Sequence, residues 1–548
     1  MLYDRNKKML HKIINEFEDG GIFVAVGILH LISEQGLLEE GMTYYKKALE
    51  LDTTYSATYL NLVGLILEGE TVLVEEMNEI ATSSKRSDYE RYDELKEERE
   101  KLYSSCLPYL EKLIEIDPKN FNANYNLGSY YFKIDDAENA EKYLNLAINI
   151  TPNHIYPYNS LFLLYDRSNN YKKLEEILKK AKNFFPENSL INFFEGIVEY
   201  RNKNFKIAID IFLKADLDKK DISRNMLKTN YLAKSYDNLG LYQEAYKFFE
   251  ISNKISEELP KNDSNKKNFM DSILKRITYF SNINTKSIEK KTHKSKNLDP
   301  VFLIGFPRSG TTLLDTILRT HNSIEVLEEK PIVDKLLKEI EKNMNCNFSN
   351  LEKINELEIK KLQDLYNDER KNYLKFDEGK IYVDKFPLNI VFLAEINKIF
   401  PNAKYILALR NPRDSVLSCF MQSFTPNDAM SNMLSINDAS NLYDQTMELF
   451  KVYEKILDLK LHVVKYENVI NNFKPTVKSL LKFLEVEWTD NLSEFYKTAE
   501  NKRIISTPSY DQVNKPLYKK SIGRWKNYED KFIETNKIFE KWDKEFNY

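Results

Sequence analysis

A glycine turn between an apolar run and an amphipathic segment is the first feature of the chain that could do chemistry. Residues 301–304 (VFLI) are short, apolar and unalternating, as expected of a buried parallel strand, and helical periodicity begins at Thr311. Between them lies the turn Gly305–Gly310, which contains Arg308. A strand, a glycine turn and a helix N-terminus gather several backbone N–H groups around one point, and such a point binds phosphate. We therefore predict a phosphate site at this turn.

The spacing of the turn argues against one common kind of phosphate site. It reads G-x-x-x-x-G-T-T, whereas a nucleoside-triphosphate loop has lysine in place of the first threonine. Without that lysine, no cation at the helix start reaches the β- and γ-phosphates. The cation of this turn is Arg308, which lies before the helix. The pattern disfavours an ATPase or GTPase and indicates a phosphate that carries one transferable group. The candidate ligand contacts are Arg308, Ser309, Gly310, Thr311 and Thr312.

The segment PRSGTTLL, at residues 307–314, resembles the 5′-phosphosulfate loop of sulfotransferases that use 3′-phosphoadenosine-5′-phosphosulfate (PAPS). The likeness is greatest to the tyrosylprotein sulfotransferases and to bacterial sulfotransferases with N-terminal tetratricopeptide repeats. It implies an α/β transferase domain with a mostly parallel sheet, PAPS as the donor, and a tyrosine in a protein or peptide as the acceptor. A glycan or small-molecule acceptor stays open, because a fold does not decide its substrate.

The segment YILALRNPRDSVLSCF, at residues 405–420, resembles the part of these enzymes that grips the 3′-phosphate. The resemblance places Arg410 and Ser418 on that group, and arginine suits a phosphate because it can form two parallel hydrogen bonds. The tyrosylprotein enzymes have a further arginine four residues beyond the serine. Here Gln422 stands at that position, which leaves one expected contact open.

Two later segments follow the same family order and imply the remaining nucleotide contacts. In LHVVKYENVINNF the matching residue is Tyr466, and in TPSYDQVNKPLYKKSIGRWKNY the matching residues of a closing loop are Ser509 and Arg524. Residues 502–526 hold seven Lys or Arg against one Asp, a local charge of +6. Such a concentration of cations suits a polyanionic nucleotide.

Sulfuryl transfer is an in-line displacement that needs a base for the acceptor's proton and cations for the developing negative charge. By resemblance to the tyrosylprotein enzymes, Glu329 in IEVLEEKP is the base, with Glu328 as the near alternative. Lys385, which ends the strand predicted in IYVDKFPLN, and Arg308 are the cations. Ligands bind where the strands of an open parallel sheet end. The histidines form no ligand spacing, and we expect no metal.

The first half of the chain repeats with a period of 34 residues, marked by Pro118, Pro152 and Pro186. Each unit is expected to form two amphipathic helices, a pattern similar to the tetratricopeptide repeat, whose helix pairs stack into a solenoid. Small residues at Gly128 and Gly196 fall where two helices would cross closely. We predict about five repeats between residues 20 and 255.

Other copies of the repeat are less regular. Residues 42–67 fit an early copy, and residues 231–250 fit a slightly offset late one. The charged stretch 82–101 is out of register and is interpreted as a solvated helix or loop inserted between repeats.

The predicted domain plan places the solenoid at residues 1–255, a basic linker at 256–298 and the sulfotransferase domain at 299–548. Within the linker, residues 286–296 hold five lysines against one glutamate, a local charge of +4. Such a run is typical of a solvated linker, and the alternative is that it lies beside a site for anionic ligands.

Composition limits the class of protein. The 548 residues carry Lys+Arg 80 against Asp+Glu 84, and 42% of them are hydrophobic, which excludes a polycationic nucleic-acid coat and a disordered chain. The three cysteines are far apart and support neither a disulfide framework nor a zinc ribbon. No uninterrupted apolar run reaches 18 residues and no secretory signal is evident. We expect a cytoplasmic protein without a membrane span.

The leading hypothesis is a PAPS-dependent sulfotransferase whose repeats recruit the acceptor or a partner protein into a groove. A nucleotide kinase is disfavoured by the missing lysine. A repeat scaffold with an inactive nucleotide-binding domain is disfavoured because Arg308, Arg410, Ser418 and Glu329 are all present.

Overall fold

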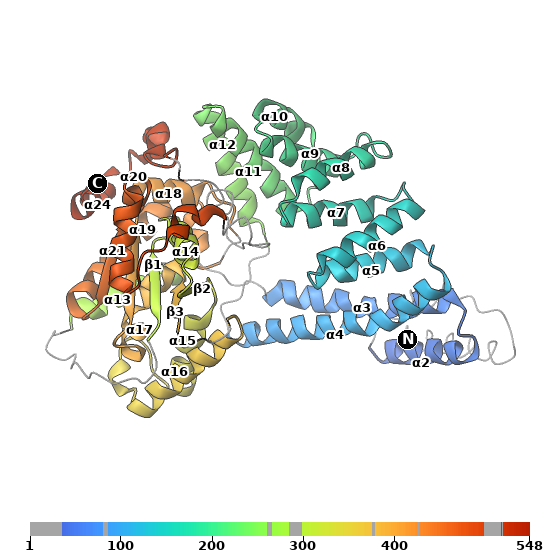
Figure 1. The fold of residues 1–548 in the computed structure, drawn as a ribbon, viewed down its shortest axis with the longest axis horizontal. Coiled ribbons are helices and arrows are strands. Elements are labelled where there is room, and N and C mark those ends of the chain that lie inside the picture. Colours follow the sequence, from blue (N-terminus) through green and yellow to red (C-terminus); the bar gives the residue numbers. More distant parts are fainter. Residues whose placement is uncertain are drawn as a thin grey trace. The chain divides into compact units, whose positions relative to one another are not determined.

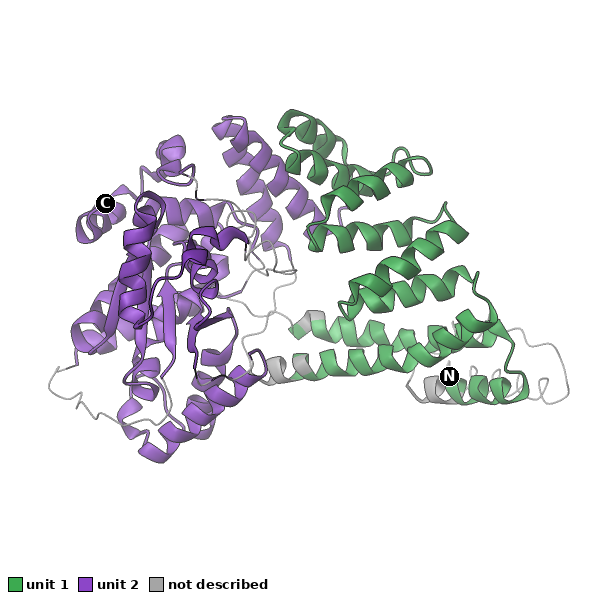
Figure 2. Cartoon of the chain, in the orientation of Figure 1, with its two compact units in different colours: residues 1–216 green, residues 217–548 purple. Residues whose placement is uncertain are grey.

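The computed structural model describes residues 35–80, 86–259, 266–283, 299–374, 377, 379–424, 427–497, 517 and 519–548. The chain divides into two compact units, Met1–Asp216 and Leu217–Tyr548, shown in Figure 2. The described residues of unit 1 are helical and connected by turns, whereas unit 2 combines helices with a five-stranded sheet.

Unit 1 is built from helices that pair with their neighbours along the chain (Figure 1). Several helices begin where a polar side chain can cap them: Asn120, Asp136 and Asn188 each accept a backbone N–H from the first turn. The helices of this unit are α2 (Gln35–Leu51), α3 (Ser56–Ile80), α4 (Arg86–Ile116), α5 (Phe121–Lys133), α6 (Ala137–Ile150), α7 (Ile155–Arg167), α8 (Tyr171–Lys182), α9 (Ser189–Arg201) and α10 (Phe205–Lys214).

The predicted close crossings are confirmed at both glycines. A Cβ atom added at Gly128 would lie 2.7 Å from Leu144 Cγ of α6, and one added at Gly196 would lie 2.5 Å from Phe212 Cε1 of α10. Because real Cβ atoms do not approach other atoms so closely, only glycine allows the two helices of each pair to pack at this distance.

The charged stretch predicted as an insertion becomes part of a long helix. Residues 86–101 form the first half of α4, which runs for 31 residues. Its arginines pair with glutamates of α3, as in Arg99 to Glu70 at 2.6 Å and Arg91 to Glu76 at 2.7 Å. By length and composition alone, one described helix could cross a membrane, at Ser56–Met77 within α3. Core helices of helical arrays have the same composition, so this finding carries no further weight.

Unit 2 begins with three helices, α11 (Ile222–Asn238), α12 (Tyr242–Glu257) and α13 (Lys266–Ser281). The sequence assigns α11 and α12 to the repeats, yet their packing places them in the unit that contains the sheet. Helix α13 lies inside the stretch predicted as a linker. Its Arg276 forms a buried ion pair with Glu395 at 2.7 Å, so this part of the stretch packs as a structural element.

The sheet has five parallel strands in the order β2-β3-β1-β4-β5. All residues of the central strand β1 are buried, because apolar side chains point to both faces and helices cover both. The strands are β1 (Val301–Gly305), β2 (Ile324–Glu328), β3 (Ile381–Lys385), β4 (Lys404–Leu409) and β5 (Lys460–Lys465).

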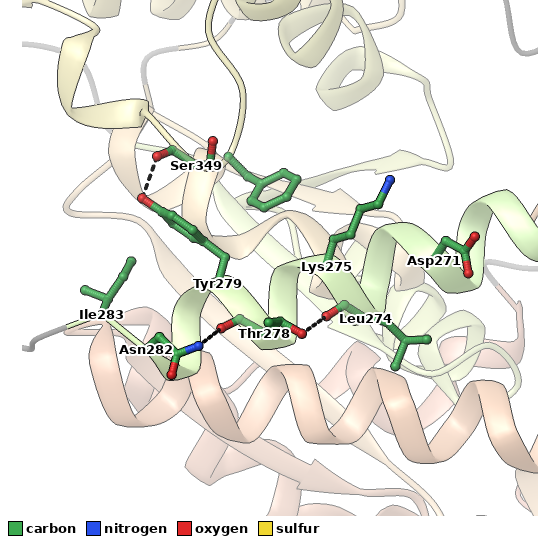
Figure 3. Close-up of a pocket in the computed structure, with 9 residues that line it drawn as sticks. Asp271, Leu274, Lys275, Thr278, Tyr279, Asn282, Ile283 and Ser349 are labelled. Atoms are coloured by element: carbon green, nitrogen blue, oxygen red, sulfur yellow. Dashed lines mark hydrogen bonds between the residues drawn. The ribbon is translucent and has the colours of Figure 1, made fainter.

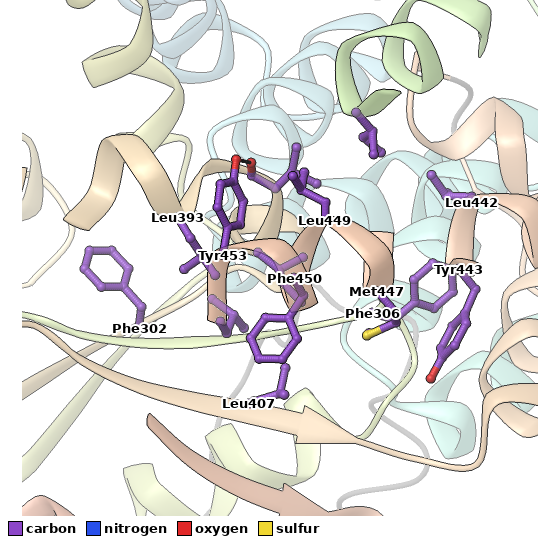
Figure 4. Close-up of a cluster of buried hydrophobic side chains, with 14 of the residues drawn as sticks. Phe302, Phe306, Leu393, Leu407, Leu442, Tyr443, Met447, Leu449, Phe450 and Tyr453 are labelled. Carbon is purple, nitrogen blue, oxygen red and sulfur yellow. Dashed lines mark hydrogen bonds between the residues drawn. The ribbon is translucent and has the colours of Figure 1, made fainter. Parts of the chain in front are cut away.

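One face of the sheet packs against α14 (Thr311–Arg319) and α21 (Phe473–Leu484). The opposite face packs on a larger core that includes α19 (Ile436–Ile456). In that core Phe450 lies near Leu407, and Tyr443 lies beside Phe306 with ring centres 5.0 Å apart (Figure 4). The other elements on that side are α15 (Ile332–Asn343), α16 (Glu356–Lys371), η4 (Pro387–Phe392), α17 (Leu393–Ile399), α18 (Pro412–Phe420), α19 (Ile436–Ile456), η7 (Arg524–Phe532) and α24 (Asn536–Phe546).

The predicted fold class is confirmed: a helical repeat region precedes an α/β domain with a parallel sheet. Parallel strands end at a common edge, and the turns after β1, β2, β3 and β4 carry most of the predicted site residues there.

Candidate active site

The turn after β1 has the tight backbone that the sequence predicts. Gly305 and Gly310 have φ of 153° and 96°, and Arg308 between them has φ of 65°. A Cβ atom at Gly305 would lie 2.5 Å from the carbonyl oxygen of Ala408 on β4. The glycines therefore allow β1, its turn and β4 to approach closely, with the turn leading directly into α14.

Two buried polar atoms at this turn have no protein partner, and both fit an anionic ligand. The Ser309 hydroxyl oxygen and the Arg410 Nε are each buried without a hydrogen bond. A buried polar atom left without a partner is costly, and a ligand oxygen at either position would supply the missing bond. The residues present therefore fit a phosphate-bearing donor such as PAPS.

The structure brings together the residues expected to hold the 3′-phosphate. Arg308 Nε donates to Ser418 Oγ at 3.1 Å, and an Arg410 terminal nitrogen donates to the Arg308 carbonyl oxygen at 3.1 Å. The Arg410 guanidinium lies 5.0 Å from the centre of the Tyr466 ring, which in turn lies against Gly310. Residues from three separate segments thus form one cluster around the turn. Their binding roles stay predictions.

The predicted base and its neighbouring cation form an ion pair. Lys385 Nζ lies 2.7 Å from a Glu329 carboxylate oxygen, and it is also 4.0 Å from carboxylate oxygens of Glu328 and of Asp315. Arg319 donates to Asp315 at 2.9 Å. Three carboxylates and two cations are therefore packed together at the ends of β2 and β3, and their charges nearly balance.

The two candidate glutamates differ in exposure. The Glu328 side chain is 9% exposed and lies on the strand, paired in register with Lys385. The Glu329 side chain is 40% exposed, whereas Lys385 is fully buried. Of the two carboxylates, Glu329 is therefore the one that a molecule arriving from solvent can reach. Its φ of 49° is uncommon for a residue with a side chain, and such strain is concentrated at functional sites.

The closing segment is described only in part. Ser509 lies outside the described residues. The Ser521 carbonyl oxygen accepts a 2.6 Å hydrogen bond from Arg410, which places residues after 518 beside the cluster. The guanidinium of Arg524 donates to Asp237 Oδ2 of α11 at 2.6 Å, a contact that the sequence pattern did not indicate.

Several residues of the site were missed by sequence reasoning. Asp414 accepts from the backbone N–H groups of Gly523 and Trp525, and Glu467 accepts from that of Asn411. Asp315 was the one with a visible signal, because it is an acid between the apolar residues Leu313, Leu314 and Ile317 of a short helix. The others bond to backbone groups distant in sequence, which no local pattern reveals.

Two further titratable groups near the site do not act as nucleophile or base. The Cys419 thiol donates to the Pro307 carbonyl oxygen at 3.5 Å, and burial raises its pKa to about 12, so it stays protonated at neutral pH. Asp384, next to Lys385, points to the other face of the sheet and accepts from the Tyr366 hydroxyl at 3.1 Å. Burial raises the pKa of Asp384 to about 7.

A hollow elsewhere on unit 2 shares no residue with this cluster (Figure 3). It lies along α13, where the Tyr279 hydroxyl donates to the Ser349 carbonyl oxygen at 2.5 Å. Lys275 is the single cation among the residues that line it, so it lacks the paired cations of the turn. In the part of the chain that the structure describes, no group of three His, Cys, Asp or Glu is arranged to hold a metal ion.

A segment in each unit of the chain matches a known protein family. Residues 300–490 match the Sulfotransferase family, and residues 121–154 match the Tetratricopeptide repeat. Residues 1–41 match the TraB/PrgY/gumN family, and the structure describes only the last seven of them. The expected resemblance is confirmed: residues 300–490 are similar to the Sulfotransferase family, and residues 121–154 are similar to the Tetratricopeptide repeat.

Relatives with similar sequences include an uncharacterised protein of Aquifex aeolicus, 28% identical over 294 residues, which are 53% of this chain and 38% of the relative. Protein-tyrosine sulfotransferase 1 of Danio rerio is 27% identical over 243 residues, 42% of this chain and 66% of the relative. The chain spans less than two thirds of the length of either relative.

A solved structure, the sulfotransferase domain of the Synechococcus PCC 7002 olefin synthase, covers 43% of this chain and 91% of its own, with 19% identity and a TM-score of 0.30.

Proposed function

We propose that this protein is a PAPS-dependent sulfotransferase that sulfates the hydroxyl of a tyrosine in a protein or peptide. The observation that carries the proposal is the Glu329–Lys385 ion pair at the same sheet edge as the glycine turn. Strands β1 and β3 are neighbours, with Leu303 in register with Lys385. The proposed base, the proposed cation and the proposed phosphate-binding turn would therefore lie at one edge of the sheet.

The donor would be held by the turn and by the cluster around Arg410. Backbone N–H groups at the start of α14 and the Ser309 hydroxyl suit the 5′-phosphosulfate, and Arg410 with Ser418 suits the 3′-phosphate. When bound, PAPS supplies the sulfuryl group, whose bond to phosphate breaks as a bond to the acceptor oxygen forms.

Glu329 would take the proton of the acceptor hydroxyl, since its carboxylate is the exposed member of the acidic group. Lys385 orients that carboxylate through the 2.7 Å contact. Lys385 and Arg308 also supply the positive charge that a developing negative charge at the sheet edge requires. The similarity to a protein-tyrosine sulfotransferase supports a tyrosine acceptor.

The repeats of unit 1 would recruit the acceptor or a partner protein. Stacked helix pairs form extended surfaces that other proteins of this architecture use for binding. Aromatic side chains lie on this unit, including Tyr156, which is 58% exposed.

The test is to incubate the full chain with labelled PAPS and a panel of tyrosine peptides, glycans and small phenols, and then identify the product by mass spectrometry. Label on a tyrosine hydroxyl is expected. Label only on a glycan or a small phenol would support sulfotransferase activity but reject tyrosine as the acceptor. Binding of PAPS without transfer to any acceptor would favour a scaffold with an inactive domain.

The substitution Glu329→Ala is expected to abolish transfer while PAPS still binds, because it removes the base and leaves the phosphate contacts intact. Activity should fall by about a hundredfold or more, with the dissociation constant of PAPS within a factor of about three.

Glu325→Ala is the matched control, because Glu325 lies on β2, the strand that leads to Glu329, and pairs with Lys380 away from the cluster. It should keep full activity. Retained turnover in Glu329→Ala would reject Glu329 as the base. A loss of turnover in Glu328→Gln but not in Glu329→Ala would identify Glu328 as the base.

A further inference from the structure

The helix pair α11–α12 holds the end of α18, the helix that carries Ser418. The side-chain amide of Asn253 donates to the carbonyl oxygens of Phe420 and Leu434, each at 3.0 Å, and Asn230 donates to that of Met421 at 3.1 Å. Both asparagines are buried. Because the last carbonyls of a helix have no partner within it, this pair completes the C-terminal end of α18.

The same pair holds the segment that follows residue 518. Asp237, near the end of α11, is 8% exposed, and both of its carboxylate oxygens accept hydrogen bonds. Oδ2 accepts from Arg524 at 2.6 Å, and Oδ1 accepts from the Tyr528 hydroxyl at 2.7 Å. The Tyr528 ring also packs edge-on against Tyr242 of α12, with ring centres 5.4 Å apart.

This segment reaches the predicted 3′-phosphate site through its backbone. Ser521 accepts from Arg410 at 2.6 Å, while the N–H groups of Gly523 and Trp525 donate to Asp414 at 2.6 and 2.9 Å. Asp414 lies in the first turn of α18. Arg524 is therefore fixed at its backbone by α18 and at its side chain by α11.

We propose that Asp237 is a positioning residue of the nucleotide site, which sets the guanidinium of Arg524 for the 3′-phosphate of the donor. The inference rests on the proposed function, because it takes the donor to be a 3′-phosphorylated nucleotide. It makes the last helix pair, which is a repeat by sequence, a working part of the transferase.

The geometry explains why a carboxylate would strengthen rather than compete with phosphate binding. A guanidinium has five N–H donors, so a carboxylate on one nitrogen leaves the planar group able to offer others to a second anion. An arginine already held in place loses less conformational freedom when the ligand binds. The Tyr528 hydroxyl donates to the second oxygen of Asp237, so both oxygens of this buried carboxylate have a partner.

The test measures the affinity of the full chain for adenosine 3′,5′-bisphosphate by titration calorimetry. Asp237→Asn and Arg524→Gln should each weaken binding by about tenfold, and the double variant should be no weaker than Arg524→Gln alone, because one residue acts through the other. In turnover with PAPS, Asp237→Asn should raise the KM for the donor and leave kcat unchanged.

Two further variants separate positioning from stability. Tyr528→Phe keeps the contact between Asp237 and Arg524, so it should lower the Tm without changing affinity. Glu244→Gln removes one charge from an exposed position of α12 and should change neither.

Additive losses in the double variant, or unchanged or tighter binding in Asp237→Asn, would overturn the inference alone. Absence of nucleotide binding in the wild-type chain would overturn the proposed function and this inference together.

Discussion

The helix pairs of unit 1 and the α11–α12 pair have the same repeat architecture but bury different side chains. Among the described residues of unit 1, the buried polar side chains are Thr58 and Asn124. In α11–α12 alone there are seven: Thr229, Asn230, Ser235, Asp237, Ser252, Asn253 and Ser256. The difference follows from what each region packs against.

A repeat that stacks on another repeat can be apolar at its contacts, because neighbouring helices satisfy their own backbone groups. The α11–α12 pair instead packs against the end of α18 and the segment after residue 518, which present backbone carbonyls and an arginine. Buried polar groups need partners, so amides and a carboxylate stand where an ordinary repeat has apolar side chains. The comparison teaches that a helix pair can follow the repeat pattern in its sequence and still pack as part of the unit that contains the sheet.

The largest effect is expected from cutting the chain on either side of this pair. Removing residues 1–216 should leave a folded transferase that binds adenosine 3′,5′-bisphosphate within about twofold of the full chain. Removing residues 1–259 takes away the hydrogen-bond partners of Arg524 and Tyr528 and of the carbonyl oxygens of Phe420, Met421 and Leu434. Each lost partner should destabilise the remaining protein by about 1–3 kcal/mol. The Tm should then fall by about 10 °C or more, as measured by calorimetry.

If both truncated proteins keep their Tm and their affinity, the α11–α12 pair does not support the unit that contains the sheet, and it does not differ from unit 1 in this respect. If both lose them, unit 1 also supports the transferase.

A smaller effect, on the pH dependence of the unfolding free energy, is expected from one of two buried carboxylates. Both oxygens of Asp237 accept hydrogen bonds, whereas Asp384 accepts from Tyr366 and its Oδ1 has no partner. Burial raises the pKa of Asp384 to about 7, against about 3.9 for an ordinary aspartate. The folded protein thus keeps a proton that the unfolded chain gives up as pH rises from about 4 to 7. Stability from this group is present at low pH and lost across that range, by up to about 4 kcal/mol.

Asp384→Asn should therefore flatten the fall in unfolding free energy between pH 5 and pH 8, and be more stable than the wild type at pH 8. Urea unfolding at both pH values measures this. Asp364→Asn, at an exposed position of α16, should keep the wild-type slope. An unchanged slope in Asp384→Asn would assign the pH dependence to other groups.

The smallest effect is expected on the unfolding free energy when one asparagine from each region is replaced by alanine. Asn253→Ala removes the donor to two buried carbonyl oxygens and should destabilise unit 2 by about 2 kcal/mol. Asn145 of α6 donates to the Glu141 carbonyl oxygen within its own helix, at a partly exposed position, and also hydrogen-bonds Tyr165, so Asn145→Ala should cost about 1 kcal/mol or less. Urea unfolding gives both values, and equal costs would remove the distinction between the regions.

Much of the fold could be predicted because its signals are local. The 34-residue period, the glycines at the crossings and the apolar run before the glycine turn can each be read from a few tens of consecutive residues. The candidate site was predictable to the extent that it occupies strand ends, as with Lys385 at the end of β3. The exposure that separates Glu329 from Glu328 was not, because two adjacent glutamates are alike in sequence.

The amino-acid sequence by itself determined the repeat architecture, the parallel sheet and the types of residue at its edge, because periodicity and turn chemistry are short-range. Only the tertiary structure decided which helices belong to the transferase and what each charged group contacts. Asp237 and Arg524 are 287 residues apart, and no spacing rule joins them. A buried carboxylate takes its partner from whatever the fold brings within hydrogen-bond distance, and that choice is made when the chain packs.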